Sequence, residues 1–171
     1  MNLVFFGASQ FGYRCLEVLL GMKDITITGV LTAPKKFTIS YSKGKEVINC
    51  LHIDFKGICD TNSIPIYELT TSMNDKSVIE AIKSWNPEFI LVAGWYHMVP
   101  KEVLDIPRKG VAGLHASLLP KYRGGAPLVW AIINGEKETG ISFFYFDNGV
   151  DSGDIIAQKK LRIEFDDTIR T

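Results

Sequence analysis

The chain has 171 residues, enough to bury one hydrophobic core, and 46 % of them are hydrophobic and 22 % charged. Its 19 Lys and Arg residues balance 19 Asp and Glu residues, so it lacks the positive surplus of proteins that bind many nucleic-acid phosphates. No apolar run approaches the roughly 20 residues of a membrane span, and the first residues lack the signals of a secretory leader. We therefore expect a cytoplasmic protein with no membrane or DNA partner.

The first 33 residues predict a strand, a helix and a second strand. The apolar run 2–6 ends at Gly7, Ser9 follows as a helix cap, and apolar residues then recur at helical spacing. A second apolar run, 25–31, predicts a strand that pairs in parallel with the first. The spacing Gly7-x4-Gly12 is not the GxGxxG of dinucleotide sites, so these glycines are predicted to make only a tight strand-to-helix connection.

The rest of the chain continues the alternation of strands and helices. The run 89–93 is apolar throughout, which is typical of a central strand covered on both faces. A weak helix is expected at about 45–55. Further strands are expected at 64–67, 111–114, 141–146 and, near an edge, 155–163, and further helices at about 75–85 and 127–134. The predicted fold class is α/β, with a doubly wound, mostly parallel sheet in a single domain, 1–171. The run 166–168 resembles a capped helix start close to the last residue, so we expect the chain to be truncated.

Three polar or irregular segments follow predicted strands: 94–100, 115–127 and 147–154. Open parallel sheets bind ligands outside the carboxyl ends of their strands, so these segments are the candidate site. A histidine at a strand end, His115, together with an acidic loop that contains Asp151, suits general acid-base chemistry. No metal is expected, because a calcium loop beginning at Asp147 would place Gln158 where a bidentate Glu is needed. The three cysteines form no CxxC pair and are predicted to be free thiols.

Two motifs carry a resemblance to a known family. His115-Ala-Ser-Leu-Leu-Pro-Lys-Tyr-Arg-Gly-Gly-Ala-Pro, followed by Asp147-x-Gly-x-Asp151-x-Gly-Asp154, resembles the core motif of the 10-formyltetrahydrofolate-dependent formyltransferases. That family includes methionyl-tRNA formyltransferase, glycinamide ribonucleotide transformylase and the sugar-nucleotide N-formyltransferases. The resemblance implies an enzyme of one-carbon metabolism with 10-formyltetrahydrofolate as co-substrate.

The resemblance also implies a catalytic set. The family's Asn-x-His pair and aspartate correspond to His115 and Asp151, but Gly113 stands where the asparagine belongs. In the family, that amide and the protonated histidine hold the negative charge that develops on the formyl oxygen. Three interpretations remain open: another donor replaces the amide, the chain is a poor or specialised catalyst, or it only binds. The candidate replacement donors are Ser117, Tyr96 and His97.

The same resemblance implies ligand-binding residues. The folate would meet the 94–100 segment, the start of the loop after His115, and the acidic loop; its expected contacts are Trp95, Tyr96, His97, Met98, Val99, Ser117, Leu118, Leu119, Pro120, Asp147 and Gly149. The acceptor would meet Gly7, Lys121, Arg123 and Gly124, with the two cations on its phosphates. The simpler alternatives are core or lid residues for 95–99 and a solvated loop for the cations.

The acceptor is expected to be a primary amine on a small molecule, first of all a sugar nucleotide. Methionyl-tRNA is the alternative, with the basic loop 35–45 as a faint indication, but the balanced charge of the chain does not favour it. A function of another class is a catalytically silent folate-binding module, which Gly113 makes conceivable.

Overall fold

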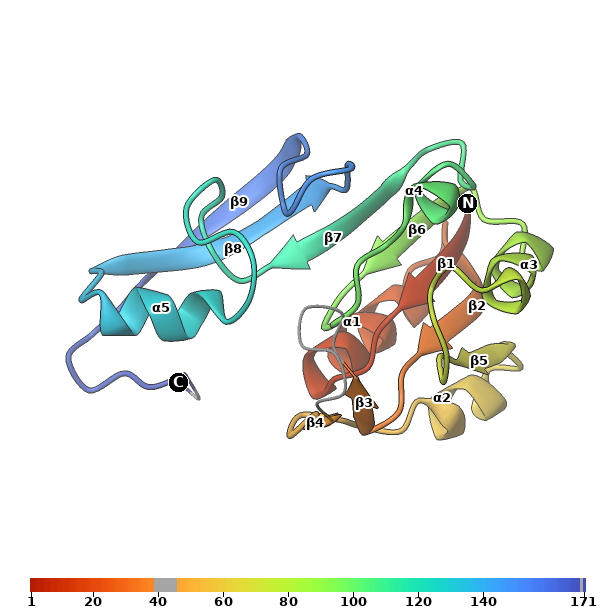
Figure 1. Ribbon diagram of the computed structural model, residues 1–171, viewed down its shortest axis with the longest axis horizontal. Helices are drawn as coiled ribbons and strands as arrows, with labels where there is room; N and C mark the ends of the chain where they lie inside the picture. Colours follow the sequence, from red (N-terminus) through yellow and green to blue (C-terminus); the bar gives the residue numbers. More distant parts are fainter. Residues whose placement is uncertain (39–45, 170) are drawn as a thin grey trace. The chain divides into compact units, whose positions relative to one another are not determined.

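The computed structural model describes residues 1–38, 46–169 and 171. The chain divides into two compact units, Met1–Val111 and Ala112–Thr171. Figure 1 shows their helices and strands, coloured along the sequence.

The first unit is built on a parallel sheet. Its strands are β1 (Asn2–Phe6), β2 (Thr26–Thr32), β5 (Ile66–Glu68) and β6 (Phe89–Val92), in the order β5-β2-β1-β6. The chain moves outward from β1 to β2 and β5 and then returns to the other side of β1, and every pair is parallel. Residues 3–6 and 90–92 are buried, as the apolar runs predict for central strands.

The helices of this unit are α1 (Gln10–Leu20), α2 (Lys56–Thr61), α3 (Lys76–Ser84) and α4 (Lys101–Leu104). The predicted cap of α1 is confirmed, because the Ser9 side chain accepts a hydrogen bond from the Gly12 N–H. Leu16 and Leu19 bury one face of this helix.

The helix expected at about 45–55 is wrong. Its first residue lies outside the described residues; the strand β4 (Glu46–Ile48) then pairs antiparallel with β3 (Lys36–Thr38), and α2 begins only after the predicted helix would have ended. Asn49 follows β4, and its side-chain amide donates to the Ala8 carbonyl at 2.8 Å. A hairpin this short is held by tertiary contacts, which a pattern within one segment does not reveal.

Glycines let β1, β6 and α1 approach closely at the carboxyl end of the sheet. Gly94 has φ +62°, and a Cβ there would lie 1.9 Å from the Ser9 Oγ. A Cβ on Gly12 would lie 2.4 Å from the Ala93 carbonyl oxygen. The tight strand-to-helix connection predicted for Gly7 and Gly12 is therefore confirmed.

Glu88 precedes β6 at the opposite end of the sheet and joins three chain segments. Its carboxylate accepts hydrogen bonds from the Arg108 guanidinium and from the Asn2 N–H, the latter at 2.8 Å, and Lys109 lies 3.5 Å away. The Arg108 hydrogen bond is the largest of the causes that hold the pKa of Glu88 at about 2.

The described residues of the second unit form antiparallel strand pairs and a helix. The strand β7 (Val111–His115), which begins at the last residue of the first unit, pairs with β8 (Glu138–Tyr145), and β8 pairs with β9 (Ile155–Arg162). The predicted edge position of β9 is confirmed. The helix α5 (Pro127–Ile133) begins at the predicted proline, and Gly135, at φ +66°, follows its end.

Two boundaries in this unit differ from expectation. The strand β8 begins at Glu138 rather than at 141, because the pairing with β9 continues to Arg162. At 166–168, where a helix start is expected, the described residues form no helix, and the chain turns at 165–166. The Asp167 carboxylate accepts a hydrogen bond of 2.8 Å from the Glu164 N–H, three residues earlier in the chain. Within the part of the chain that the structure describes, no helix has the length and apolarity needed to cross a membrane.

Candidate active site

His115 is the last residue of β7, and its imidazole ring is held by a backbone carbonyl. The ring Nε2 lies 2.8 Å from the carbonyl oxygen of Tyr122. A carbonyl oxygen only accepts, so Nε2 must carry the hydrogen, and in the neutral ring Nδ1 has the lone pair. The ring stands nearly perpendicular to that of Phe144, with 6.4 Å between the ring centroids.

Asp151 faces the other ring nitrogen. Its Oδ2 lies 3.5 Å from His115 Nδ1 and accepts a hydrogen bond of 2.8 Å from the Gly124 N–H. The two side chains are only 11 % and 21 % exposed. Asp151 adopts φ +48°, a left-handed conformation that is uncommon for residues other than glycine. The structure therefore brings together the two side chains that the motifs single out.

This arrangement suits a ring that becomes positively charged. With the Nε2 hydrogen committed to Tyr122, His115 can donate a second hydrogen bond only from a protonated Nδ1. The carboxylate of Asp151 stabilises that cation, but 3.5 Å is longer than an ordinary N–H···O hydrogen bond. Nδ1 of His115 is thus available to an acceptor other than Asp151.

The acidic loop holds its own shape through Asp147. The carboxylate accepts a 2.7 Å hydrogen bond from the Ser152 hydroxyl and a 2.9 Å bond from the Gly149 N–H, and these two donors lower the pKa of Asp147. A Cβ on Gly149 would lie 2.0 Å from the Ser152 Oγ, so the loop closes tightly there. The side chain of Asp147 is therefore turned into its own loop.

The loop after His115 contains residues expected to contact folate. The Ser117 hydroxyl donates to the Lys121 carbonyl at 2.7 Å, and the residue is fully buried. Ser117 is consequently engaged within the loop and is not a free replacement for the missing asparagine amide. Leu119 is buried too, and its peptide bond to Pro120 is cis.

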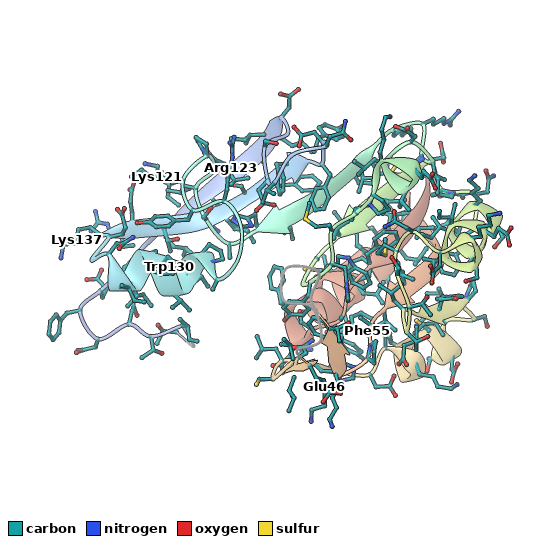
Figure 2. All side chains as sticks on the ribbon, viewed as in Figure 1. Glu46, Phe55, Lys121, Arg123, Trp130 and Lys137 are labelled. Atoms are coloured by element: carbon teal, nitrogen blue, oxygen red, sulfur yellow. The ribbon has the colours of Figure 1, made fainter. Side chains whose placement is uncertain are left out.

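Two of the residues expected to contact an acceptor are exposed cations on this loop. Figure 2 labels Lys121 and Arg123, which in the sequence follow β7 and precede α5. Lys121 Nζ lies 3.9 Å from a Glu136 carboxylate oxygen, and Arg123 contributes to the lowered pKa of Asp147. Gly124, also expected to contact an acceptor, uses its N–H to hold Asp151.

The first unit holds the other expected folate segment in an aromatic cluster. Trp95 packs against Phe6 and His97, with centroids 5.7 Å and 5.2 Å away, and His97 and Tyr96 both contact Phe37 of β3. Trp95 Nε1 and His97 Nε2 are buried and have no hydrogen-bond partner among the described residues. Burial lowers the pKa of His97 and raises that of Tyr96.

The remaining members of the two expected sets differ in exposure; Leu118 is half-buried and Pro120 is exposed. Met98 is exposed and Val99 is buried. Gly7 is buried, its N–H donates to the Leu31 carbonyl, and a Cβ would lie 2.5 Å from the Phe5 ring. Gly7 thus serves the close packing of the sheet end.

Two backbone groups of the site could not be predicted from the sequence. These are the Tyr122 carbonyl, which binds His115, and the Gly124 N–H, which binds Asp151. A backbone group has no residue-type signature, although Gly124 at φ +89° marks a turn. Among the residues that the structure describes, no three His, Cys, Asp or Glu side chains gather as they would around a metal ion.

The sequence model of the family described as formyl transferase matches residues 1–171. The chain belongs to the formyl transferase family. It is 38 % identical over 164 residues to a methionyl-tRNA formyltransferase of Clostridioides difficile (strain 630), covering 96 % of this chain and 50 % of that protein. It is 40 % identical over 163 residues to one of Clostridium beijerinckii, covering 95 % and 50 %. This formyl transferase chain therefore spans about half the length of the curated relatives it matches.

The fold of this formyl transferase chain is found in a solved structure. The crystal structure of phosphoribosylglycinamide formyltransferase from Bacillus halodurans matches with a TM-score of 0.78 and 22 % identity, over 99 % of this chain and 84 % of that one. This likeness confirms the predicted α/β class with a mostly parallel sheet.

Proposed function

We propose that the chain transfers a formyl group from 10-formyltetrahydrofolate to a primary amine, with His115 and Asp151 as its catalytic residues. The observation that carries this proposal is the geometry around His115: Nε2 is fixed by a carbonyl, and Nδ1 faces a carboxylate at 3.5 Å. Membership of the formyl transferase family supports the reaction class.

The reaction forms a bond between the amine nitrogen and the formyl carbon and breaks the bond between that carbon and the folate nitrogen. Negative charge develops on the formyl oxygen during the attack, and protonated His115 Nδ1 donates to it. Asp151 stabilises the imidazolium and, through a water molecule, accepts the proton that the amine nitrogen loses once it has bonded to the formyl carbon. That proton ends on the folate nitrogen that departs.

Gly113 makes His115 the principal donor of this unit. The family's asparagine would supply a second donor, and removing one such donor costs about 2.7 to 4 kcal/mol, or about 100- to 1000-fold in rate. The Ser117 hydroxyl is bound to Lys121 and does not replace it. We therefore expect a slower enzyme than a family member that has the complete Asn-x-His pair.

The 95–99 segment fits a pterin ring. A pterin presents a flat aromatic face with hydrogen-bonding groups at its edge, and Trp95 Nε1 and His97 Nε2 are buried polar atoms without partners in the described part of the chain. Tyr96 and Met98 add exposed apolar surface. Burial leaves unpaired polar groups costly, so a ligand that pairs them gains free energy.

Methionyl-tRNA is the better-supported acceptor. Two relatives at 38 % and 40 % identity are named methionyl-tRNA formyltransferases, whereas neither name supports the sugar nucleotide expected from the sequence. Exposed Lys121 and Arg123 are the cations proposed to meet acceptor phosphates. The balanced charge is a weak argument against methionyl-tRNA, because it describes a chain that spans about half the length of its relatives.

The test is transfer by the purified chain from 10-formyltetrahydrofolate to methionyl-tRNA, to amino-sugar nucleotides and to glycinamide ribonucleotide, each followed by mass spectrometry of the acceptor. We expect formylation of methionyl-tRNA and its loss in His115→Ala. His52→Ala, which removes another of the three histidines, is the control and should keep the rate. Folate binding without formylation of any acceptor would favour the silent folate-binding module. An active His115→Ala variant would overturn the catalytic assignment.

A further inference from the structure

A buried hydroxyl of β8 binds the loop that follows His115. Ser142 is opposite His115 in the β7–β8 register and is fully buried. Its Oγ donates to the Ser117 carbonyl at 2.6 Å and accepts from the Leu119 N–H at 3.0 Å. One side chain thus binds two backbone groups of the loop, which lie two residues apart.

Gln158 of β9 completes the contacts of this hydroxyl. Its Nε2 donates one hydrogen to Ser142 Oγ at 2.8 Å and the other to the Leu119 carbonyl at 2.9 Å. A hydroxyl has one hydrogen and two lone pairs, so the hydrogen-bonding capacity of Ser142 is fully used. We name Ser142 and Gln158 the clamp.

The clamp connects to both catalytic side chains through the loop. Ser117, bound through its carbonyl, holds the Lys121 carbonyl with its own hydroxyl at 2.7 Å. The next residue, Tyr122, presents the carbonyl that binds His115 Nε2 at 2.8 Å. Two residues further, the Gly124 N–H holds Asp151.

Packing of the sheet alone does not require polar side chains at Ser142 and Gln158. Interior strand positions are usually filled by apolar side chains, and burying a hydroxyl is unfavourable unless it is hydrogen-bonded. Neighbouring Phe144 on the same strand is fully apolar and equally buried. The hydroxyl of Ser142 is matched to the polar groups of the loop, and these are the groups that set the shape of the loop.

We propose that Ser142 and Gln158 are positioning residues that fix the Nε2–H tautomer and the orientation of His115. The proposal rests on the proposed function for its catalytic consequence, but not for the tautomer itself. When the clamp is broken, the loop relaxes, the Tyr122 carbonyl leaves Nε2, and the ring exchanges between its two tautomers and orientations. Nδ1 is then presented to the formyl oxygen in only part of the molecules.

The first experiment reads the tautomer directly. The chain has three histidines, so nitrogen-15 NMR of the ring nitrogens can resolve His115, with His52 and His97 as internal references. We expect the neutral ring of His115 to be almost wholly Nε2–H, and Ser142→Ala to shift the tautomer ratio about fivefold or more. Ser142→Thr keeps a hydroxyl and should restore the ratio. Ser84→Ala, which removes an exposed hydroxyl bonded to the Ala81 carbonyl, should leave the ratio unchanged.

The second experiment measures kcat for formyl transfer. We expect Ser142→Ala to lower kcat about 10- to 100-fold, because His115 loses its orientation in part of the molecules. Gln158→Met should lower kcat by a smaller factor than Ser142→Ala. In the double variant the fold decrease in kcat should be smaller than the product of the two single decreases, because the two side chains are hydrogen-bonded to each other. Val103→Ala, a buried change in α4, supplies the comparison for a general loss of stability.

The outcomes separate the clamp from the proposed function. An unchanged tautomer ratio in Ser142→Ala and Gln158→Met overturns the clamp, as does a loss of kcat no larger than in Val103→Ala. Gln158 lies on the exposed edge strand, so Gln158→Met decides the matter if Ser142→Ala does not fold. A shifted ratio in a chain that formylates nothing supports the clamp and contradicts the proposed function alone.

Discussion

Replacing Asp151 by asparagine removes one charge and leaves the shape of the side chain nearly unchanged. The amide oxygen can still accept the hydrogen bond from the Gly124 N–H. What is lost is the attraction between the carboxylate and protonated His115, whose nearest atoms are 3.5 Å apart. Asp151→Asn is therefore a change of electrostatics at constant packing.

The distance sets the size of the effect. Two unit charges 3.5 Å apart attract by about 5 kcal/mol at an effective dielectric constant of about 20 and by about 1 kcal/mol in water. Both side chains are largely buried, so the effect lies between these limits. At about 1.4 kcal/mol for each tenfold change in rate, Asp151→Asn should slow transfer between about 10- and about 1000-fold.

Single-turnover formyl transfer with saturating donor and acceptor measures the loss without a contribution from product release. Asp154→Asn removes the same charge from the same loop and is the matched control; its rate should stay within a few-fold of the parent. Thermal unfolding should show that both variants are folded. A folded Asp151→Asn variant as fast as Asp154→Asn would refute the electrostatic role of Asp151.

Three further predictions concern stability and reactivity. Glu88 has its pKa depressed to about 2 by a guanidinium and a backbone N–H. Its contribution to stability is therefore complete above the unfolded pKa near 4.5 and disappears as the pH falls toward 2. Urea unfolding of Glu88→Gln should show a weaker pH dependence in that window, and identical curves for the two proteins would contradict this role of Glu88. Gly94→Ala should lower the free energy of unfolding in urea by about 2 to 3 kcal/mol, because Gly94 has a positive φ and an added Cβ would displace the Ser9 cap. A decrease of less than about 1 kcal/mol would contradict the close approach. Exposed Cys50 should react with a thiol reagent in the native chain, whereas Cys59, which is buried and has its pKa raised to about 11 by desolvation, should react only on unfolding.

The sequence predicts those elements whose signal is local. The strands β1 and β6 are continuous apolar runs, and α1 has a serine cap and a helical period, so each is found at nearly its predicted position. The hairpin of β3 and β4 has three residues in each strand, and neither strand has such a signal. It forms because of contacts with distant residues, such as the 5.7 Å stacking of Phe37 on Tyr96.

The same division holds at the candidate site. His115 and Asp151 are found from their motifs, because titratable side chains in a loop pattern are visible in a sequence. The groups that hold them are backbone atoms of Tyr122 and Gly124, which every residue possesses. Ser142 stands between the apolar residues Ile141 and Phe143, and its role is visible only once its three partners are placed.

Gly113 and the clamp together lead to one last prediction. A site with two oxyanion donors retains one of them when the histidine ring rotates, but this chain has glycine at the position of the second donor. Rotation of His115 should therefore reduce the rate of transfer more in this chain, and loss of the clamp should have a larger effect on that rate. Restoring the amide with Gly113→Asn should raise the rate and also shrink the fold loss that Ser142→Ala causes. The four chains of this double-mutant cycle, compared by single-turnover rate with thermal unfolding as the check on folding, measure the coupling. Equal fold losses from Ser142→Ala with Gly113 and with asparagine would show that the clamp does not act through the oxyanion donor of His115.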